Sequence, residues 1–234
     1  MDKVKYPKYF KILIALFAFL IFFSGCKGQE KKEFAVQKGS ITCPQGLEPV
    51  FVLRAIDGDT VLLEGNEKLR YAGINSLELH TESYKPEPYA EEAYQKNKEL
   101  VEGKILCLER ALRDRDRYGR LLGELYFPNG TSISEVLVSE GLAFVCYYEG
   151  SGKNFNKLLS IQRRAIAERK NLFSYIDKPQ GKLNYIGNKK SRRFYHPQCR
   201  EAYKIKSKII FNNLEEALKK GYCPSRECSN LIFN

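Results

Sequence analysis

Low contents of proline and cysteine narrow the kind of protein that this sequence can encode. Among 234 residues there are only 9 prolines, whereas 43% of the residues are hydrophobic and 12% are aromatic. This composition provides enough apolar side chains for a core, so a disordered or low-complexity chain is excluded. The 7 cysteines are too few for a miniature scaffold held together mainly by disulfides. The length allows one or two domains.

The N-terminal apolar run is too short to cross a membrane. Residues 12–23 are uninterrupted apolar side chains, which as a helix span about 18 Å, whereas a hydrocarbon core is about 30 Å thick. Four lysines precede this run and Ser24-Gly25-Cys26 follows it. This order of basic, apolar and small residues is typical of a secretory signal. We therefore expect residues 1–25 to be a signal peptide and residues 26–47 to be a tether.

Residues 23–26, Phe-Ser-Gly-Cys, resemble the lipobox of bacterial lipoproteins, with phenylalanine where leucine is usual. The resemblance implies that Cys26 is lipidated and that the exported protein is anchored to a membrane of the bacterial cell envelope. The alternative is cleavage nearby, which would leave Cys26 as an ordinary thiol and the protein secreted.

The excess of positive charge lies at the two ends of the chain. The formal net charge is +11, of which residues 1–25 contribute +3 and residues 181–234 contribute +8. Residues 26–180 are formally neutral. A basic surface attracts polyanions such as nucleic acid, so the C-terminal residues are the candidate for retaining a polyanion. The neutral middle segment would have to recognise an anion through a few placed groups.

The middle segment has the pattern of a small barrel. β-Rich residues flank the turn dipeptide Asp57-Gly58, which predicts a hairpin over residues 50–63. Further strands are predicted at residues 68–74, 105–109 and 121–127, with an extended run at 142–148, and helices at 88–102, 132–140 and 157–170. This order predicts an α+β fold, a five-stranded OB-type β-barrel with three helices, over residues 48–176. A small basic α/β module with Cys and His is expected over residues 181–230.

Polar residues gather in three short segments of this barrel. They are Asp57 and Asp59 at the bend, Arg70, Asn75, Ser76 and Glu78 after the third strand, and Asp116, Arg117, Tyr118 and Arg120 in a later loop. Attack of water on a phosphodiester builds negative charge on the phosphate oxygens, so such chemistry needs fixed cations, a hard metal and a carboxylate base. Each segment by itself is typical of a turn or of solvated charge.

Together, four blocks resemble the staphylococcal nuclease family in order and approximate spacing. The blocks are Ala-Ile-Asp-Gly-Asp-Thr-Val at 55–61, Leu-Arg-Tyr-Ala-Gly-Ile-Asn-Ser-Leu-Glu at 69–78, Asp-Arg-Tyr-Gly-Arg-Leu at 116–121 and Leu-Val-Ser-Glu-Gly-Leu-Ala at 137–143. The resemblance implies calcium-dependent hydrolysis of phosphodiester bonds in DNA and RNA, with single strands preferred. We expect a monomer.

The resemblance also implies a role for individual residues. Calcium would be held by Asp59, Asn75 and Ser76, with Asp57 behind them; Glu78 would be the general base; Arg70 and Arg120 would bind the phosphate; and Tyr118, Tyr147 and Arg117 would bind the nucleotide. Arginine suits phosphate because its planar fork engages two oxygens and stays charged. Tyrosine rings suit stacking on unpaired bases.

Two positions depart from the family pattern. Asn75 stands where the family usually has aspartate, and Leu77 where it usually has proline. Because calcium affinity follows the charge of the ligands, we expect weaker metal binding here. Leu77 loosens the loop that carries Glu78. The alternative is therefore a catalytically weakened module that binds nucleic acid or protein without turnover, or a structural lipoprotein of the envelope.

The C-terminal segment resembles the small module related to the metal-binding domain of the Ada repair protein. The resemblance rests on His196, Cys199, Cys223 and Cys228, although the spacing differs and Ser225 occupies an expected cysteine position. These ligand types suit zinc, whereas an exported protein can instead oxidise the cysteines to disulfides. Both alternatives stay open, since six cysteines other than Cys26 allow fifteen complete pairings. Cys107 and Cys146 are expected to be buried thiols, and His80 a loop residue.

Overall fold

The computed structural model describes residues 41–79, 85–148, 154–177 and 183–233. The predicted signal peptide, Cys26 and His80 lie outside the described residues. Within the described part of the chain, no helix is both long enough and apolar enough to span a bilayer.

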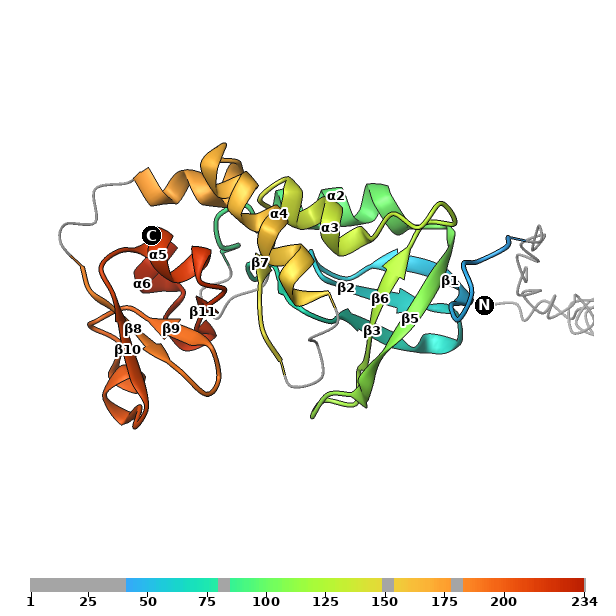
Figure 1. The fold of residues 1–234 in the computed structure, drawn as a ribbon. Helices are drawn as coiled ribbons and strands as arrows, with labels where there is room; N and C mark the ends of the chain where they lie inside the picture. Colours follow the sequence, from blue (N-terminus) through green and yellow to red (C-terminus); the bar gives the residue numbers. More distant parts are fainter. Residues whose placement is uncertain (1–40, 80–84, 149–153, 178–182, 234) are drawn as a thin grey trace, which may run out of the picture. The chain divides into compact units, whose positions relative to one another are not determined.

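Five strands close into a barrel in the order β1-β2-β3-β6-β5. They are β1 (Glu48–Ala55), β2 (Thr60–Leu63), β3 (Lys68–Tyr71), β5 (Ile105–Arg115) and β6 (Leu121–Tyr126). All neighbours are antiparallel except β3 and β6, which run parallel. The predicted hairpin is confirmed, because β1 ends and β2 begins on either side of the Asp57-Gly58 bend. The OB-type barrel predicted from the sequence is therefore present (Figure 1).

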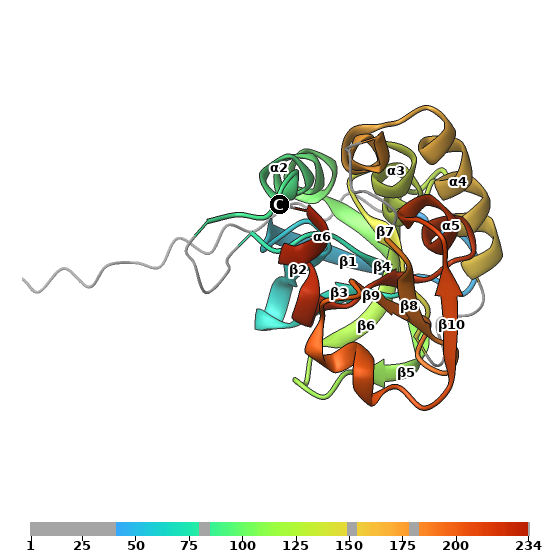
Figure 2. The same cartoon turned by 90° about the vertical axis from the view of Figure 1, so that its left-hand side faces the viewer.

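Three helices cover one side of this barrel, as Figures 1 and 2 both show. They are α2 (Ala90–Val101), α3 (Ile133–Ser139) and α4 (Phe155–Ala167). At the start of α3 the side chain of Ser132 accepts a hydrogen bond from the Glu135 amide, which satisfies one of the unpaired donors of the first helical turn. The apolar faces of α2, α3 and α4 complete the barrel core with side chains such as Ala93, Leu137 and Leu158.

A short two-stranded ladder connects the barrel to the C-terminal segment. It pairs β4 (Ile74–Asn75) with β7 (Phe144–Val145) in antiparallel register. A four-stranded sheet then follows in the order β10-β8-β9-β11. Its strands are β8 (Tyr185–Asn188), β9 (Arg193–Tyr195), β10 (Lys208–Phe211) and β11 (Cys223–Pro224), with helices α5 (Leu214–Lys219) and α6 (Asn230–Phe233). The expected small α/β module is thus present.

Short 3₁₀ helices complete the fold at Glu64–Asn66, Asn171–Asp177, Arg200–Lys204 and Arg226–Cys228. The C-terminal module shares a hydrophobic core with the segments that follow the barrel strands. Phe144 of β7 stacks on Phe233 of α6, with ring centroids 5.4 Å apart. The buried Gln162 of α4 joins β7 to α5, because it accepts from the Val145 amide and donates to the Leu218 carbonyl. Accordingly, Ser40–Asn234 form one compact unit.

All six cysteines among the described residues are in disulfides, which corrects the prediction that Cys107 and Cys146 are free thiols. Both are buried, as expected. Cys107 lies on β5 beside β1 and bonds to Cys43, just before β1. Cys146 follows β7 and bonds to Cys223 of β11. The cysteines of these two disulfides are separated by 64 and 77 positions in the sequence. The pairing therefore follows from the tertiary fold and not from local sequence.

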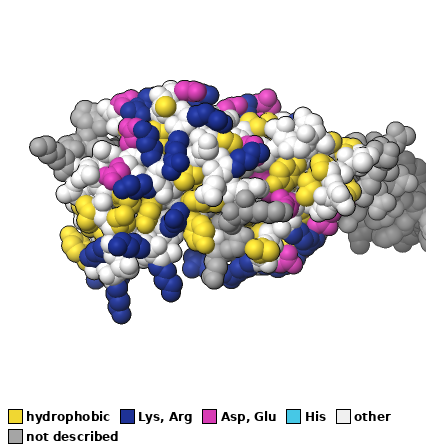
Figure 3. All heavy atoms as spheres, in the orientation of Figure 1, with side chains coloured by type: hydrophobic (Ala, Val, Ile, Leu, Met, Phe, Trp, Pro, Cys, Tyr) yellow, Lys and Arg dark blue, Asp and Glu magenta, His cyan; other side chains and the backbone are white. Residues whose placement is uncertain are grey.

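Charge is unevenly spread over the surface. In Figure 3, Lys and Arg side chains are numerous over the face formed by α4 and the C-terminal strands and helices, with a few acidic side chains among them. This agrees with the net +8 of residues 181–234.

Candidate active site

The bend between β1 and β2 depends on a glycine because it packs closely against the side chains of Ser76 and Ala93. A Cβ atom on Gly58 would lie 2.7 Å from the Cβ atoms of both Ser76 and Ala93. Such contacts are far inside the van der Waals limit, so only glycine fits here. Within the bend, the Asp59 amide donates to Asp57 Oδ1 at 2.9 Å. The bend therefore brings Asp59 against the segment that contains Ser76.

Helix α2 supports this bend through a buried hydrogen-bond chain. The Tyr71 hydroxyl donates to Asn97 Oδ1 at 2.8 Å, and Asn97 Nδ2 donates to the Asp57 carbonyl at 2.8 Å. Asp57 itself is sensitive to its surroundings: burial, reinforced by the charge of Asp59, raises the pKa of its carboxyl to about 7. The raised pKa means that ionising the Asp57 carboxyl costs free energy, and a nearby cation would lower this cost.

The centre of the site is a buried ion pair between Asp59 and Arg70. Asp59 Oδ1 lies 2.9 Å from Arg70 Nε, and both side chains are only 4% exposed. Asp59 Oδ2 accepts from the Ser76 amide at 2.7 Å. The other guanidinium nitrogens of Arg70 donate to the Tyr71 carbonyl and, at 2.9 Å, to Asn75 Oδ1. Two of the three polar segments, that of Asp59 and that of Arg70 to Ser76, thus meet around one guanidinium.

Glu78 lies beside this cluster and is half-exposed, at 40%. Its Oε1 forms an ion pair of 3.0 Å with Nε of Arg226, from the C-terminal module. Partial burial raises the pKa of the Glu78 carboxyl above its ordinary value; Arg226 opposes this, and Asp59 and Glu87 reinforce it. A carboxylate with a raised pKa and access to solvent can accept a proton from water.

The predicted calcium ligands come together, and their chemistry fits a hard cation because all are oxygens. No group of three or more His, Cys, Asp or Glu side chains suited to a metal occurs among the described residues. The Ser76 carbonyl accepts from Asn75 Nδ2 at 2.8 Å. Asn75 Oδ1 accepts from Arg70 and, at 3.1 Å, from Arg226. A cation at Asn75 would therefore compete with two guanidinium groups, while Asp59 supplies the full negative charge.

Arg120 is held by the loop in which it lies. Its Nε donates to Asp116 Oδ2 at 2.8 Å, while Asp116 Oδ1 accepts from the amides of Tyr118 and Arg120. Gly119 permits the turn through its positive φ of 78°. The Tyr118 ring is 62% exposed and has the guanidinium groups of Arg117 and Arg120 at 4.7 and 5.5 Å from its centroid. The loop thus presents an aromatic surface between two cations.

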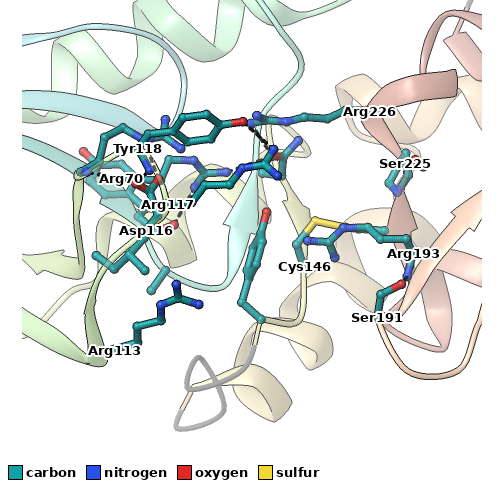
Figure 4. A pocket seen from close by; sticks show the side chains of 18 of the residues that line it. Arg70, Arg113, Asp116, Arg117, Tyr118, Cys146, Ser191, Arg193, Ser225 and Arg226 are labelled. Atoms are coloured by element: carbon teal, nitrogen blue, oxygen red, sulfur yellow. Dashed lines mark hydrogen bonds and ion pairs between the residues drawn. A yellow bond between two sulfur atoms is a disulfide. The ribbon is translucent and has the colours of Figure 1, made fainter.

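A cavity of about 480 Å³ lies between this loop, β3 and the C-terminal module. Its lining has six arginines against two carboxylates, Asp116 and Glu227. The arginines are Arg70, Arg113, Arg117, Arg120, Arg193 and Arg226. Figure 4 shows Arg70 and Arg117 on the barrel side and Arg193 and Arg226 reaching in from the opposite side. A cavity with this excess of guanidinium groups is suited to an anion with several phosphates.

The structure places the two predicted tyrosines differently. Tyr118 lines the cavity, whereas Tyr147 does not and packs edge-on against Phe155 with centroids 5.7 Å apart. The neighbouring Tyr148 lines the cavity instead, with the Arg193 guanidinium 4.5 Å from its ring centroid. Because alternate residues of an extended segment face opposite sides, a shift of one position moves the aromatic side chain out of the site.

The zinc alternative for the C-terminal module is not supported. Cys199 and Cys228 are joined in a disulfide, and Cys223 is bonded to Cys146. Among the described residues, no free thiolate is then left for a metal, and no cluster of side chains suited to zinc occurs. His196 is buried, its Nδ1 accepts from the Gln198 amide at 3.2 Å, and burial lowers its pKa. The disulfide alternative is the one that forms.

Sequence reasoning missed Tyr148, Arg193 and Arg226 as members of the site. Arg226 lies between two cysteines in a segment interpreted as metal-binding, and Arg193 in a run of basic residues typical of solvated surface. The one available signal was the concentration of positive charge after residue 181.

Residues 68–175 match the family described as staphylococcal nuclease homologue. The chain is 38% identical to the SPbeta prophage-derived endonuclease YokF of Bacillus subtilis over 126 residues, 52% of this chain and 42% of that protein. It is 36% identical to endonuclease YncB of the same organism over 141 residues, 58% and 63% of the two chains.

The chain thus spans about half of the length of these relatives. It covers a larger share of the thermonuclease of Staphylococcus hyicus, to which it is 30% identical over 126 residues, 53% of this chain and 74% of that protein. The matched region contains Arg70, Glu78 and Arg120 of the site described above. The chain belongs to the staphylococcal nuclease family.

Proposed function

We propose that this protein is an exported, calcium-dependent endonuclease that hydrolyses phosphodiester bonds of single-stranded DNA, RNA or both. One observation carries the proposal: the buried Asp59–Arg70 pair joins Asn75 and Ser76 at the edge of an arginine-lined cavity, with Glu78 alongside. Relatives whose names include endonuclease and thermonuclease support it.

The proposed chemistry assigns a task to each side chain. Arg70 and Arg120 bind the phosphate and stabilise the charge that grows on its oxygens during attack. Glu78 accepts the proton of the attacking water. Tyr118 and Arg117 hold the nucleotide. Calcium, when bound to Asp59, Asn75 and Ser76, would supply a Lewis acid for the phosphate and a site for water. Asp59 and Ser76 keep Arg70 in place before substrate arrives.

Export is supported by the cysteines. All six that the structure describes are paired, and such disulfides persist in oxidising compartments outside the cytoplasm. We propose that the mature protein begins at a lipidated Cys26, which the mass of the mature N-terminal peptide would check; an unmodified Cys26 or cleavage elsewhere would instead indicate secretion.

The test is cleavage by the purified full chain. Single-stranded DNA and RNA are incubated with millimolar calcium or with a chelator. We expect fragments with calcium, and no fragments with chelator. An oxidised, folded protein that cleaves neither polymer at any calcium concentration would contradict the proposal.

A second candidate function is binding without turnover. The observation that favours it is that Arg226 contacts two predicted site residues at once. It donates to Asn75, the predicted calcium ligand, and forms an ion pair with Glu78, the predicted general base. Salt-sensitive binding of the same polymers without fragments would support this candidate over the enzyme.

A further inference from the structure

Arg226 belongs to the C-terminal module but reaches the centre of the barrel's site. Its Nε lies 3.0 Å from Glu78 Oε1, and its Nη2 donates to Asn75 Oδ1 at 3.1 Å. In Figure 4 its side chain extends from the module across the cavity toward the barrel. The module is therefore part of the site.

Covalent anchors fix the backbone on both sides of Arg226. Three residues before it, Cys223 is bonded to Cys146 beside β7, and two residues after it, Cys228 is bonded to Cys199. The Cys228 amide also donates to the Ser225 carbonyl, forming a tight turn. A side chain on such a turn is pre-organised, which lowers the ordering cost of binding a ligand.

Arg226 and Arg70 converge on one neutral oxygen. Nη2 of Arg70 donates to Asn75 Oδ1 at 2.9 Å, and Nη2 of Arg226 donates to the same atom at 3.1 Å. Each guanidinium also pairs with its own carboxylate, Arg70 with Asp59 and Arg226 with Glu78. The point that the two groups share is an uncharged amide oxygen, where a phosphate oxygen would form stronger, charge-assisted hydrogen bonds. The half-exposed Arg226, at 49%, keeps donors accessible from the cavity. The two guanidinium groups thus lie close enough to each other to contact one phosphate group.

We propose that Arg226 is a substrate-binding residue that the C-terminal module supplies to the nuclease site, where it binds a backbone phosphate of single-stranded nucleic acid opposite Arg70 and Arg120. The inference rests on the proposed function and deepens it. Arg193, packed on Tyr148, extends the same wall. A cavity of about 480 Å³, lined by the barrel and by the module, is in the range that holds small ligands and so suits one or two nucleotides of a flexible strand.

Binding can be measured without chemistry. A 5′-phosphorylated trinucleotide of deoxythymidine is titrated into the full chain with a chelator present, because the proposed hydrolysis then does not proceed. We expect Arg226→Ala to weaken binding about tenfold or more, as for loss of a charge-assisted hydrogen bond. The slope of log affinity against log salt should fall by about 0.7. Arg226→Lys, which keeps the charge but not the fork, should bind with intermediate affinity.

The matched control is Arg200→Ala, which removes the same charge from an exposed position of the same module outside the cavity. We expect unchanged trinucleotide binding. Equal losses in the Arg200 and Arg226 variants would mean general attraction to a basic surface and would overturn the inference. Unchanged binding by Arg226→Ala would overturn it too.

Cleavage separates substrate binding from a blocking role. With calcium, Arg226→Ala should lower kcat/KM; a rise would mean that Arg226 caps Glu78 and holds the enzyme inactive, which contradicts the proposal. Failure of the proposed function gives another result: a wild-type chain that never cleaves while Arg226→Ala still loses trinucleotide affinity leaves the binding role intact.

Discussion

Asn75 shows how one residue can change the charge balance of a site. Its amide oxygen accepts from two guanidinium groups, and its amide nitrogen donates to the Ser76 carbonyl. An aspartate at this position would bring a negative charge to the same point. The neutral side chain therefore leaves Asp59 as the one carboxylate among the three ligands predicted here, with Asp57, whose pKa burial raises to about 7, behind it.

This balance predicts a gain for Asn75→Asp. Because calcium affinity rises with the charge of the ligands, we expect the variant to bind calcium about tenfold more tightly. Isothermal titration calorimetry with calcium alone measures this directly. Asn129→Asp, the same change on an exposed turn, should leave the affinity unaltered. An unchanged dissociation constant for the Asn75 variant would mean that this oxygen is not a ligand.

Most residues of the site were predictable, because they lie in short motifs whose chemistry is shared. Asp59, Arg70, Asn75 and Ser76 do meet, as expected. Tyr148 was missed by one position, since the direction of each side chain in a short irregular segment depends on tertiary packing. Cysteine pairing was not predictable because many pairings are compatible with one sequence.

Between β6 and α3 there is a second buried carboxyl that no part of the proposed chemistry uses. Glu124 is 6% exposed. It accepts hydrogen bonds from the hydroxyl groups of Ser132 and Ser134 and from the Ser134 amide. Burial raises the pKa of Glu124 to about 7, although these hydrogen bonds oppose the shift. The carboxyl thus joins the last barrel strand to the start of the helix.

The raised pKa makes stability depend on pH. In the unfolded chain Glu124 loses its proton near its ordinary pKa of about 4.3, while the folded chain keeps it up to about 7. The stabilisation is therefore complete below about 4.3 and decreases as pH rises to about 7, by about 1.4 kcal/mol per pKa unit.

Urea unfolding at pH 5 and pH 8 measures this contribution. Glu124→Gln, which does not titrate, should lose less stability between the two pH values than the wild type. If both proteins show the same pH dependence, Glu124 is already ionised in the folded state.

At the level of elements, periodicity and turn residues predicted the strands and helices of the barrel. They did not predict the full length of β5 or the pairing of strands that are distant in the sequence. Strand β5 was expected to end at residue 109 and instead continues to Arg115, because Arg110 and Arg115 still pair with β6 across an irregular register. Its charged composition had suggested a loop. The β4–β7 ladder joins two-residue strands about seventy positions apart, and no local pattern could identify such a pair.

At the scale of the whole molecule, the C-terminal module lines the cavity of the site and packs against the barrel segment. Its basic charge was expected to retain substrate. In the structure, Arg193 and Arg226 line the same cavity as four barrel arginines, and the module shares its core with β7 and α4. Deleting residues 181–234 would therefore expose that core and open the Cys146–Cys223 bond, so point variants test the module's role more cleanly.

The central claim is that one site, built around the Asp59–Arg70 pair, uses Glu78 as its base. The most direct measurement is the rate of calcium-dependent cleavage of single-stranded DNA by Glu78→Gln, with Glu99→Gln as control because Glu99 is 73% exposed on α2. We expect Glu78→Gln to lower kcat by about 10²–10⁴-fold, and Glu99→Gln to match the wild type. Cleavage by Glu78→Gln at the wild-type rate would contradict this account of the site.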